Sequence, residues 1–265
     1  MLFDDLGANS FALLNRDDFH NEIMVQNTKA KVLTYGLKTM ADYKCKIIEN
    51  DFTGLLLNVE NKEVWTRLIG RFNAYNVLTA YSTAKLLEED STEVLTEISK
   101  LTPVRGRFQQ IKGSSGVTGI VDYAHTPDAL LKVLETINEI KNDDQQVFTI
   151  IGCGGNRDKT KRPEMAKIAV NNSERVILTS DNPRNEDPEA IIADMEKGVE
   201  PGNSKKTLAI TNRKEAIKAA VSQAKPNDII LIAGKGHETY QIIGDEVLDF
   251  NDMEILTEYL KQFAS

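Results

Sequence analysis

Cysteine and long hydrophobic runs are scarce in this sequence of 265 residues, and each scarcity excludes a class of protein. The only cysteines, Cys45 and Cys153, are too few and too far apart for a disulfide framework or a cysteine metal cluster. The longest apolar run, Ile229–Ala233, is far shorter than the roughly 18 residues that cross a membrane. The first five residues, Met-Leu-Phe-Asp-Asp, carry no basic region and predict no signal peptide. These features predict a cytoplasmic protein without a membrane partner.

Basic residues are also in deficit, because 32 Lys and Arg face 40 Asp and Glu, for a net charge of −8. This balance argues against a nucleic-acid partner, since such proteins must neutralise phosphates. Proline and glycine, at 7 and 16 residues, are too rare for a collagen-like or disordered chain. With 41% hydrophobic residues, the chain can fold as one large or two ordinary globular domains. A few local arginines could still hold a small anionic substrate.

From residue 115 onward, short apolar runs alternate with helical segments, which is typical of an α/β fold with a mostly parallel, Rossmann-like sheet. Thr126-Pro127 and Asp187-Pro188 each combine a capping residue with a proline suited to the first helical turn. Gly244-Asp245 predicts an antiparallel hairpin at the edge of this domain. The expected strands are Val117–Asp122, Val147–Gly152, Val176–Ser180, Thr207–Ile210 and Asp228–Ala233, with further helices beginning at Asn212 and Asn251.

The first hundred residues read differently and show no pattern of a complete core. We expect strands at Phe11–Asn15 and Val32–Tyr35, a hairpin around Asp51–Gly54, and a helix whose apolar stripe includes Asn76–Ala84. The helical pattern stops near Pro103, so we divide the chain there, into domains 1–103 and 104–265.

Four polar clusters follow directly on predicted parallel strands. The carboxyl edge of an open parallel sheet is where ligands bind, so all four clusters should face one crevice. A single polar loop would mean little, because such loops are commonly polar and rich in glycine. The clusters are Asp122–His125, Gly152–Arg157, Asp181–Arg184 and Gly234–Glu238.

The glycine-rich cluster after the second strand predicts an anion site but no dinucleotide cofactor. The G-x-G-x-x-G fingerprint would need glycine at position 157, where this chain has Arg157. Exposed backbone amides ahead of a helix still bind anions, and basic side chains add positive charge. These are Arg157, Lys159, Lys161 and Arg162, of which Arg157 is closest to the glycines and Lys159 and Lys161 better fit a solvated helix start.

The Asp181-Asn182-Pro183-Arg184 cluster suits a zwitterion, because Asp181 can accept from an ammonium while Arg184 grips a carboxylate. A helix-capping turn with a surface arginine is the alternative. Gly234–Glu238 contains Gly-Lys, but Ile229 occupies the place of the first glycine of a phosphate-binding P-loop. It lacks the second histidine of a zinc motif as well, so we expect a tight loop that presents Glu238 to an amine.

Asp122 ends a predicted strand, where ribose-binding acids are found in nucleotide sites. His125 lies beside it at a helix start, where a lone histidine is usually only a satisfied polar residue. No Ser-His-Asp or Cys-His pattern is recognisable, so the sequence predicts no catalytic nucleophile and no metal site.

Taken together and in order, these clusters resemble the ATP-dependent Mur ligases of peptidoglycan synthesis, and within them the members that add the third stem-peptide residue. Two more segments fit the same pattern: Gly70–Asn76 resembles the family's adenine-side asparagine motif, and Arg105–Phe108 its domain-joining element. The resemblance covers essentially the whole chain. It implies that residues 1–103 are the C-terminal part of the central ATP-binding domain and that residues 104–265 are the amino-acid-binding domain.

The resemblance also implies roles for individual residues. Asn73 and Asn76 would face the adenine, Arg107 the ATP phosphates and Asp122 the ribose, with His125 beside the nucleotide. The Asp-Asn-Pro-Arg form of the turn is associated with meso-diaminopimelate, whose second carboxylate Arg184 could pair. The residues implied to hold the incoming amino acid are Arg157, Asp181, Asn182, Pro183, Arg184, Gly234 and Glu238.

The implied enzyme is a monomeric ligase with ATP and Mg²⁺ as cofactors that adds meso-2,6-diaminopimelate to UDP-N-acetylmuramoyl-L-alanyl-D-glutamate, a step in cell-wall synthesis. The family's phosphate-binding loop and Mg²⁺ ligands do not occur in these residues, so we expect no catalytic residue here and no activity of the isolated chain. The alternatives are a non-catalytic amino-acid- or nucleotide-binding fragment and a ligase like folylpolyglutamate synthase.

Overall fold

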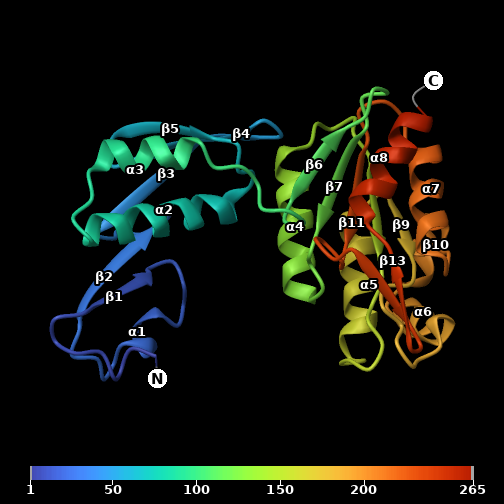
Figure 1. Ribbon diagram of the computed structural model, residues 1–265, viewed down its shortest axis with the longest axis horizontal. Coiled ribbons are helices and arrows are strands. Elements are labelled where there is room, and N and C mark those ends of the chain that lie inside the picture. Colours follow the sequence, from blue (N-terminus) through green and yellow to red (C-terminus); the bar gives the residue numbers. More distant parts are fainter. Residues whose placement is uncertain (1, 264–265) are drawn as a thin grey trace. The chain divides into compact units, whose positions relative to one another are not determined.

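The computed structural model describes residues 2–263 and has two compact units that divide between Pro103 and Val104. Both units mix helices with β-sheets, which confirms the expected α/β class (Figure 1). Every helix within residues 2–263 is too short or too polar to span a membrane.

The first unit is built on a five-stranded sheet in the order β1-β2-β3-β4-β5. The first three strands run parallel, while β3–β4 and β4–β5 are antiparallel pairs. The predicted strands, hairpin and helix of this unit are present, and α1, β5 and α3 are additional. The elements are β1 (Phe11–Asn15), α1 (Asn21–Met24), β2 (Lys31–Gly36), β3 (Tyr43–Asp51), β4 (Gly54–Val59), β5 (Lys62–Thr66), α2 (Arg71–Leu86) and α3 (Ser91–Ser99).

The expectation of no complete core in this unit is wrong. Strands β3 to β5 pack against α2 and α3, and their apolar faces bury a cluster that includes Leu55, Leu57 and Tyr81. The sequence hid this core because its members come from separate short strands and from two helices. The outer strands β1 and β2 contribute less, since Phe11 and Val32 are exposed.

The second unit has a six-stranded sheet in the order β10-β9-β8-β11-β7-β6. All pairs are parallel except β6–β7. Helices α4, α5 and α6 cover one face, and α7 and α8 cover the other (Figure 1). The bounds are β6 (Gln109–Lys112), β7 (Thr118–Asp122), α4 (Pro127–Ile140), β8 (Val147–Ile151), α5 (Lys161–Asn172), β9 (Arg175–Leu178), α6 (Pro188–Glu196), β10 (Thr207–Ala209), α7 (Arg213–Gln223), β11 (Ile229–Ala233) and α8 (Asp252–Gln262).

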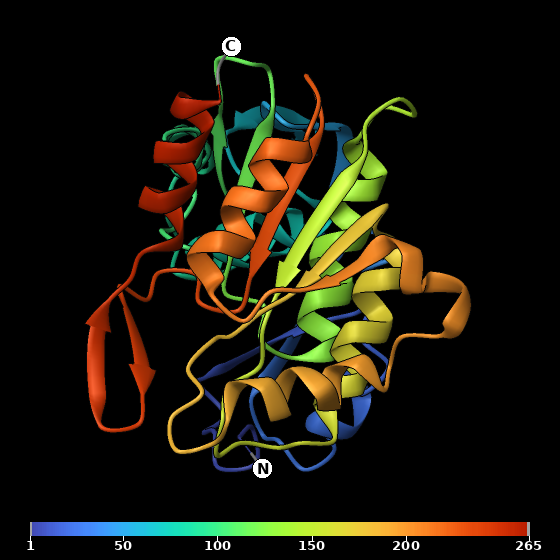
Figure 2. The same cartoon turned by 90° about the vertical axis from the view of Figure 1, so that its right-hand side faces the viewer.

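The predicted hairpin forms, as β12 (Tyr240–Ile243) and β13 (Glu246–Asp249). It is a separate two-stranded sheet that stands apart from the main one (Figure 2). A single bridge between Ile243 and Arg184 joins it to the loop after β9. The antiparallel edge strand of the main sheet is β6, which the sequence did not predict.

Strand order explains where a ligand can bind. The chain passes from β7 through α4 to β8, beyond the position of β11, and returns from β10 through α7 to insert β11 between β8 and β7. Strands β7, β11 and β8 are fully buried, and their carboxyl ends lie in register side by side. The loops that leave these ends diverge, which opens a crevice at that edge.

Candidate functional site

The crevice contains a cavity of about 610 Å³, within the size range of small-molecule sites. All four polar clusters predicted to meet there contribute to its lining. The lining includes Arg157, Asp181, Asn182, Arg184, Gly234, Glu238 and His125, together with Tyr123, Lys161 and Tyr240. Of the residues expected to hold an amino acid, Pro183 alone is not in the lining; it is buried, and its carbonyl oxygen accepts from the N–H of Glu186 at 3.0 Å.

Arg184 is held by the backbone of the surrounding loops. Its own backbone adopts a left-handed conformation, with φ of 52°. Its N–H donates to the carbonyl oxygen of Ile242, and its carbonyl oxygen accepts from the N–H of Gly244 in the turn of the hairpin. Its Nη1 donates to the carbonyl oxygens of Gly155 at 3.0 Å and Asn182 at 3.3 Å. No acidic side chain among residues 2–263 forms an ion pair with Arg184. Its charge is therefore oriented but not neutralised.

Arg157 is the second arginine of the cavity, and it is exposed at the end of the glycine-rich loop. It too has no ion pair with an acidic side chain in the part of the chain that the structure describes. The neighbouring Arg162 is different, and its inclusion in the basic cluster is wrong. Arg162 is buried and its guanidinium pairs with Glu186 and Asp194, each at 3.0 Å, so it cannot serve a ligand in the cavity.

Asp181 provides negative charge at the end of β9. One carboxylate oxygen accepts from the N–H of Asn182 at 2.7 Å, and the side chain is largely buried. The other oxygen lies where any side chain at position 234 would be, since an added Cβ on Gly234 would come within 2.8 Å of it. Gly234 also has a φ of 115°, which residues with side chains rarely adopt. The glycine thus keeps the loop after β11 against Asp181.

Lys235 is the residue that the sequence reasoning missed. It is fully buried, and its Nζ donates to Asn182 Oδ1 at 3.1 Å and to Glu238 Oε2 at 3.2 Å. Asn182 Nδ2 also donates to Glu238 Oε2, at 2.9 Å. In the sequence, a Gly-Lys pair indicates at most a phosphate-binding loop, and a lysine's burial has no local sequence signal.

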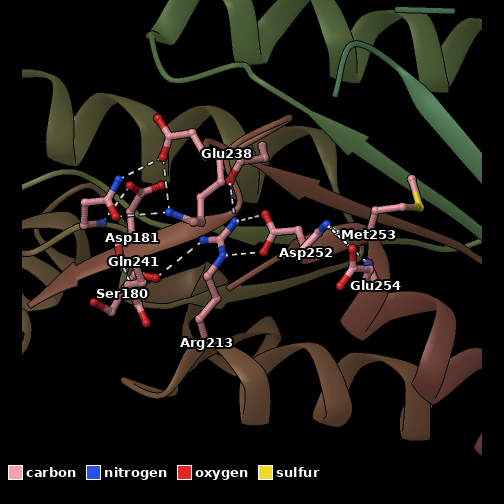
Figure 3. Close-up of polar contacts among 12 residues, drawn as sticks. Ser180, Asp181, Arg213, Glu238, Gln241, Asp252, Met253 and Glu254 are labelled. Atoms are coloured by element: carbon pink, nitrogen blue, oxygen red, sulfur yellow. Dashed lines mark hydrogen bonds and ion pairs between the residues drawn. The ribbon is translucent and has the colours of Figure 1, made fainter. Parts of the chain in front are cut away.

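A second missed group is drawn beside Asp181 in Figure 3. Arg213, at the start of α7, forms a doubly hydrogen-bonded ion pair with Asp252, at the start of α8, at 2.8 and 2.7 Å, and both are fully buried. Burial lowers the pKa of Arg213, but the Asp252 charge and hydrogen bonds raise it, and the net shift is upward. Arg213 also donates to the carbonyl oxygen of Ala233 at 3.1 Å. This pair fixes the end of β11.

Asp122 lies at the end of β7, as predicted, and points inward. Its two carboxylate oxygens accept from the N–H groups of Phe108 and Ala124, each at 2.7 Å. Burial raises the pKa of Asp122. The two hydrogen bonds and the charge of Arg107 lower it by less, so the net shift is upward. Gly106, in the same turn as Phe108, has a φ of 70° and so little space that an added Cβ would lie 2.1 Å from the His237 nitrogen. Asp122 therefore fastens the Arg105–Phe108 turn to the sheet.

Tyr123 is the centre of an aromatic group beside the cavity. Its ring lies 4.7 Å from that of His125 and 5.1 Å from that of His237, between centroids. The Arg107 guanidinium lies over the same ring at 5.9 Å. Arg107 and His125 are thus brought to one region, next to Asp122.

The two asparagines expected to face adenine lie in the first unit. Asn73 Nδ2 donates to the carbonyl oxygen of Ile69 at 2.8 Å, and Asn76 Nδ2 donates to Asn73 Oδ1 at 3.1 Å. They share one face of α2. Tyr75, between them, donates to Asp17 at 2.8 Å, which connects α2 to the loop after β1.

The described residues contain no group of three or more His, Cys, Asp or Glu side chains placed to hold a metal ion. Burial raises the pKa of the Cys153 thiol in the glycine-rich loop to about 11, so it is a protonated, inert side chain at neutral pH. A larger hollow of about 840 Å³ lies in the first unit along residues 36–46, but Arg157, Arg184, Asp181 and Glu238 converge only on the cavity in the second unit.

Two family models match this sequence. A family model described as the Mur ligase middle domain matches residues 1–84, and one described as Mur ligase, glutamate ligase domain, matches residues 106–236. The UDP-N-acetylmuramoyl-L-alanyl-D-glutamate–2,6-diaminopimelate ligase of Cytophaga hutchinsonii is 52% identical over 260 residues, which are 98% of this chain and 53% of that protein. The chain thus spans about half the length of the curated relatives it matches.

Solved structures of related ligases also resemble this chain. A UDP-N-acetylmuramoyl-L-alanyl-D-glutamate–2,6-diaminopimelate ligase aligns with a TM-score of 0.66 and 37% identity, over 95% of this chain and 53% of that one. A folylpolyglutamate synthase from Thermotoga maritima aligns with a TM-score of 0.64 but 17% identity, over 84% of this chain and 50% of that one. The second likeness is one of fold alone.

Proposed function

The chain belongs to the Mur ligase family, and from this we propose that it supplies the amino-acid-binding part of an ATP-dependent ligase that adds meso-2,6-diaminopimelate to UDP-N-acetylmuramoyl-L-alanyl-D-glutamate in peptidoglycan synthesis. Residues 1–103 would belong to the ATP-binding domain and residues 104–265 to the amino-acid-binding domain. The proposal includes the cytoplasmic location and monomeric state that the sequence predicts. The 52% identical relative named for this reaction supports it.

The charge pattern of the cavity is the observation that carries the proposal. Two arginines, Arg157 and Arg184, enter it without an acidic partner in the described chain, while Asp181 and Glu238 enter from the loops after β9 and β11. Diaminopimelate carries two carboxylates and two ammonium groups, so it complements this set. Lysine has one carboxylate and would leave one arginine uncompensated.

Orientation of the amine is the chemical task that these residues would perform. Arg184 would grip the distal carboxylate, Arg157 the other carboxylate, and Asp181 with Glu238 the ammonium groups. Held this way, one amine faces the D-glutamate carbonyl, which ATP has activated as an acyl phosphate. The amine nitrogen then bonds to that carbon, phosphate leaves and a proton is lost. Such catalysis depends on positioning and electrostatics.

The nucleotide side would use Arg107 toward the phosphates and Asn73 with Asn76 toward the adenine, with His125 close by. Asp122 would contact the ribose through lone pairs that remain on its oxygens, besides holding the Arg105–Phe108 turn. ATP supplies the phosphoryl group and Mg²⁺ neutralises its charge in such ligases. Among residues 2–263 no group of three or more acidic, histidine or cysteine side chains is placed to hold a metal ion, so no step here is assigned to one.

Calorimetry on the chain tests the proposal, with meso-diaminopimelate, L-lysine and L-glutamate as ligands. We expect diaminopimelate to bind at least tenfold more tightly than either other amino acid. Preference for glutamate would favour a folylpolyglutamate-synthase-like ligase. Equal affinity for all three would contradict the assignment of the cavity.

A further inference from the structure

Lys235 has an environment that stability alone does not explain. A fully buried ammonium must lose its hydration, and a buried ion pair is often no more stable than a well-packed apolar replacement. The nearby Arg213–Asp252 pair already fixes the end of β11. Lys235 instead reaches from the loop after β11 to two residues that line the cavity, Asn182 and Glu238.

Asn182 can have only one orientation of its side-chain amide. Oδ1 accepts from Lys235 Nζ at 3.1 Å and from the N–H of Ile242 at 3.0 Å, while Nδ2 donates to the carboxylate of Glu238. A flipped amide would place its NH₂ against two donors and its oxygen against an anion. Lys235 therefore helps to fix both the amide and the carboxylate it contacts.

Glu238 accepts the hydrogen bonds from Lys235 and Asn182 on the same carboxylate oxygen. Oε2 accepts from Lys235 and Asn182, whereas Oε1 makes no hydrogen bond within residues 2–263. The side chain is 17% exposed, and Glu238 is part of the cavity lining. The Lys235 ammonium also lies 5.6 Å from the centre of the Tyr240 ring, another lining residue. One carboxylate oxygen is thus anchored below the cavity and the other is left for a ligand.

We propose that Lys235 is a positioning residue for the incoming amino acid, which acts by fixing Glu238 and Asn182 so that Glu238 Oε1 accepts from the ligand's ammonium group. This inference rests on the proposed function of the cavity. It assigns the lysine of the Gly234–Glu238 loop a role in amino-acid binding, without contact to ATP phosphates.

The test is calorimetric binding of meso-diaminopimelate to four forms of the whole chain: wild type, Lys235→Met, Glu238→Gln and the double variant. Methionine has a similar length but no charge. We expect Lys235→Met and Glu238→Gln each to weaken binding about 10- to 100-fold, because each removes a charge-assisted contact or its support. The double variant should bind within about threefold of Glu238→Gln, since Lys235 acts through Glu238. A stoichiometry near one shows that affinity, and not the folded fraction, has changed.

Lys141→Met is the matched control. Lys141 is mostly buried and pairs with Glu174 at 3.1 Å, near the amino end of β8 and away from the cavity. It should lose stability while keeping wild-type affinity. If Lys235→Met does not fold, the double variant has no unpaired buried charge and its comparison with Glu238→Gln decides.

Two results would overturn the inference: unchanged affinity in Lys235→Met, or losses in the double variant that multiply those of the single variants. Both differ from failure of the proposed function, in which wild type itself would not bind diaminopimelate.

Discussion

At the scale of residues, the partner of each charged group decides what it can do for a ligand. Arg162 and Arg157 are five positions apart, yet the first is buried between Glu186 and Asp194 and the second faces the cavity. The sequence indicated a basic cluster but could not separate the two, because the acidic partners of Arg162 lie more than twenty residues away along the chain. The contact of Lys235 with Asn182 likewise joins residues 53 positions apart, although its other partner, Glu238, is only three positions away.

Arg184→Ala should change amino-acid selectivity. The variant removes the grip on the distal carboxylate, which is worth about 1.5–3 kcal/mol, so diaminopimelate should bind roughly ten- to a hundredfold more weakly. Lysine, with an ammonium at that position, should bind no worse. Calorimetry with both ligands gives the ratio, and Arg175→Ala, an exposed arginine at the start of β9, is the control. Equal weakening for both ligands would show that Arg184 does not discriminate.

Glu186→Gln should change how the stability of the folded protein falls as the pH is lowered. The N–H of Asn156, then the hydrogen bonds of Arg162 and Lys159, lower the pKa of Glu186 from 4.5 to about 2, against the effect of burial. A lowered pKa in the folded state means that the carboxylate stabilises the protein above about pH 4.5 and loses this contribution as the pH falls toward 2.

Thermal melts between pH 7 and 2 test this expectation. Wild type should exceed Glu186→Gln in Tm at pH 6, and the two curves should converge toward pH 2. The exposed Glu196→Gln on α6 is the control. A Tm difference that is constant with pH would contradict the shift.

At the scale of elements, the capping residues in the sequence correctly predicted where helices begin. The side chains of Thr126, Asp187, Asn212 and Asn251 each accept backbone hydrogen bonds at a helix start, as predicted. Strand β6 was missed because its sequence, Gln-Gln-Ile-Lys, has no run of β-branched residues. The hairpin was recognised from its turn, but a turn motif does not determine which sheet, if any, the strands join.

Breaking the buried Arg213–Asp252 ion pair should strongly destabilise the folded protein. Arg213→Met leaves the Asp252 charge buried without its partner, which costs about 3–5 kcal/mol in such sites. The double change Arg213→Met with Asp252→Leu removes both charges and should recover most of that loss. Urea unfolding of the single and double variants measures the free energies. Equal destabilisation by the single and the double change would mean that packing, not the unpaired charge, dominates.

At the scale of the whole molecule, the crevice could be predicted because it follows from strand direction alone. Four runs ending in polar clusters had to meet at one edge if the strands were parallel, and Asp181, Arg184 and Glu238 do line one cavity. The buried groups around it could not be predicted, since Lys235 with Asn182 and Arg213 with Asp252 come together only after the sheet and its covering helices have formed. The identity of a residue in a motif shows which chemical group it carries, but it does not show whether that group is buried.

The last prediction concerns the independence of the second unit. Its core lies between the six-stranded sheet and the helices on its faces, and all residues of the cavity belong to it. Residues 104–265 expressed alone should therefore melt cooperatively and bind diaminopimelate as the whole chain does. The first unit exposes large apolar side chains such as Phe19 and Met40, so it buries less of its apolar surface and should open more readily. Hydrogen exchange on the whole chain should accordingly protect β7, β8 and β11 longest. A segment 104–265 without a cooperative melt would show that the second unit depends on the first for its fold, and stronger protection of β3 and β4 than of β11 would show that the first unit is the more stable one.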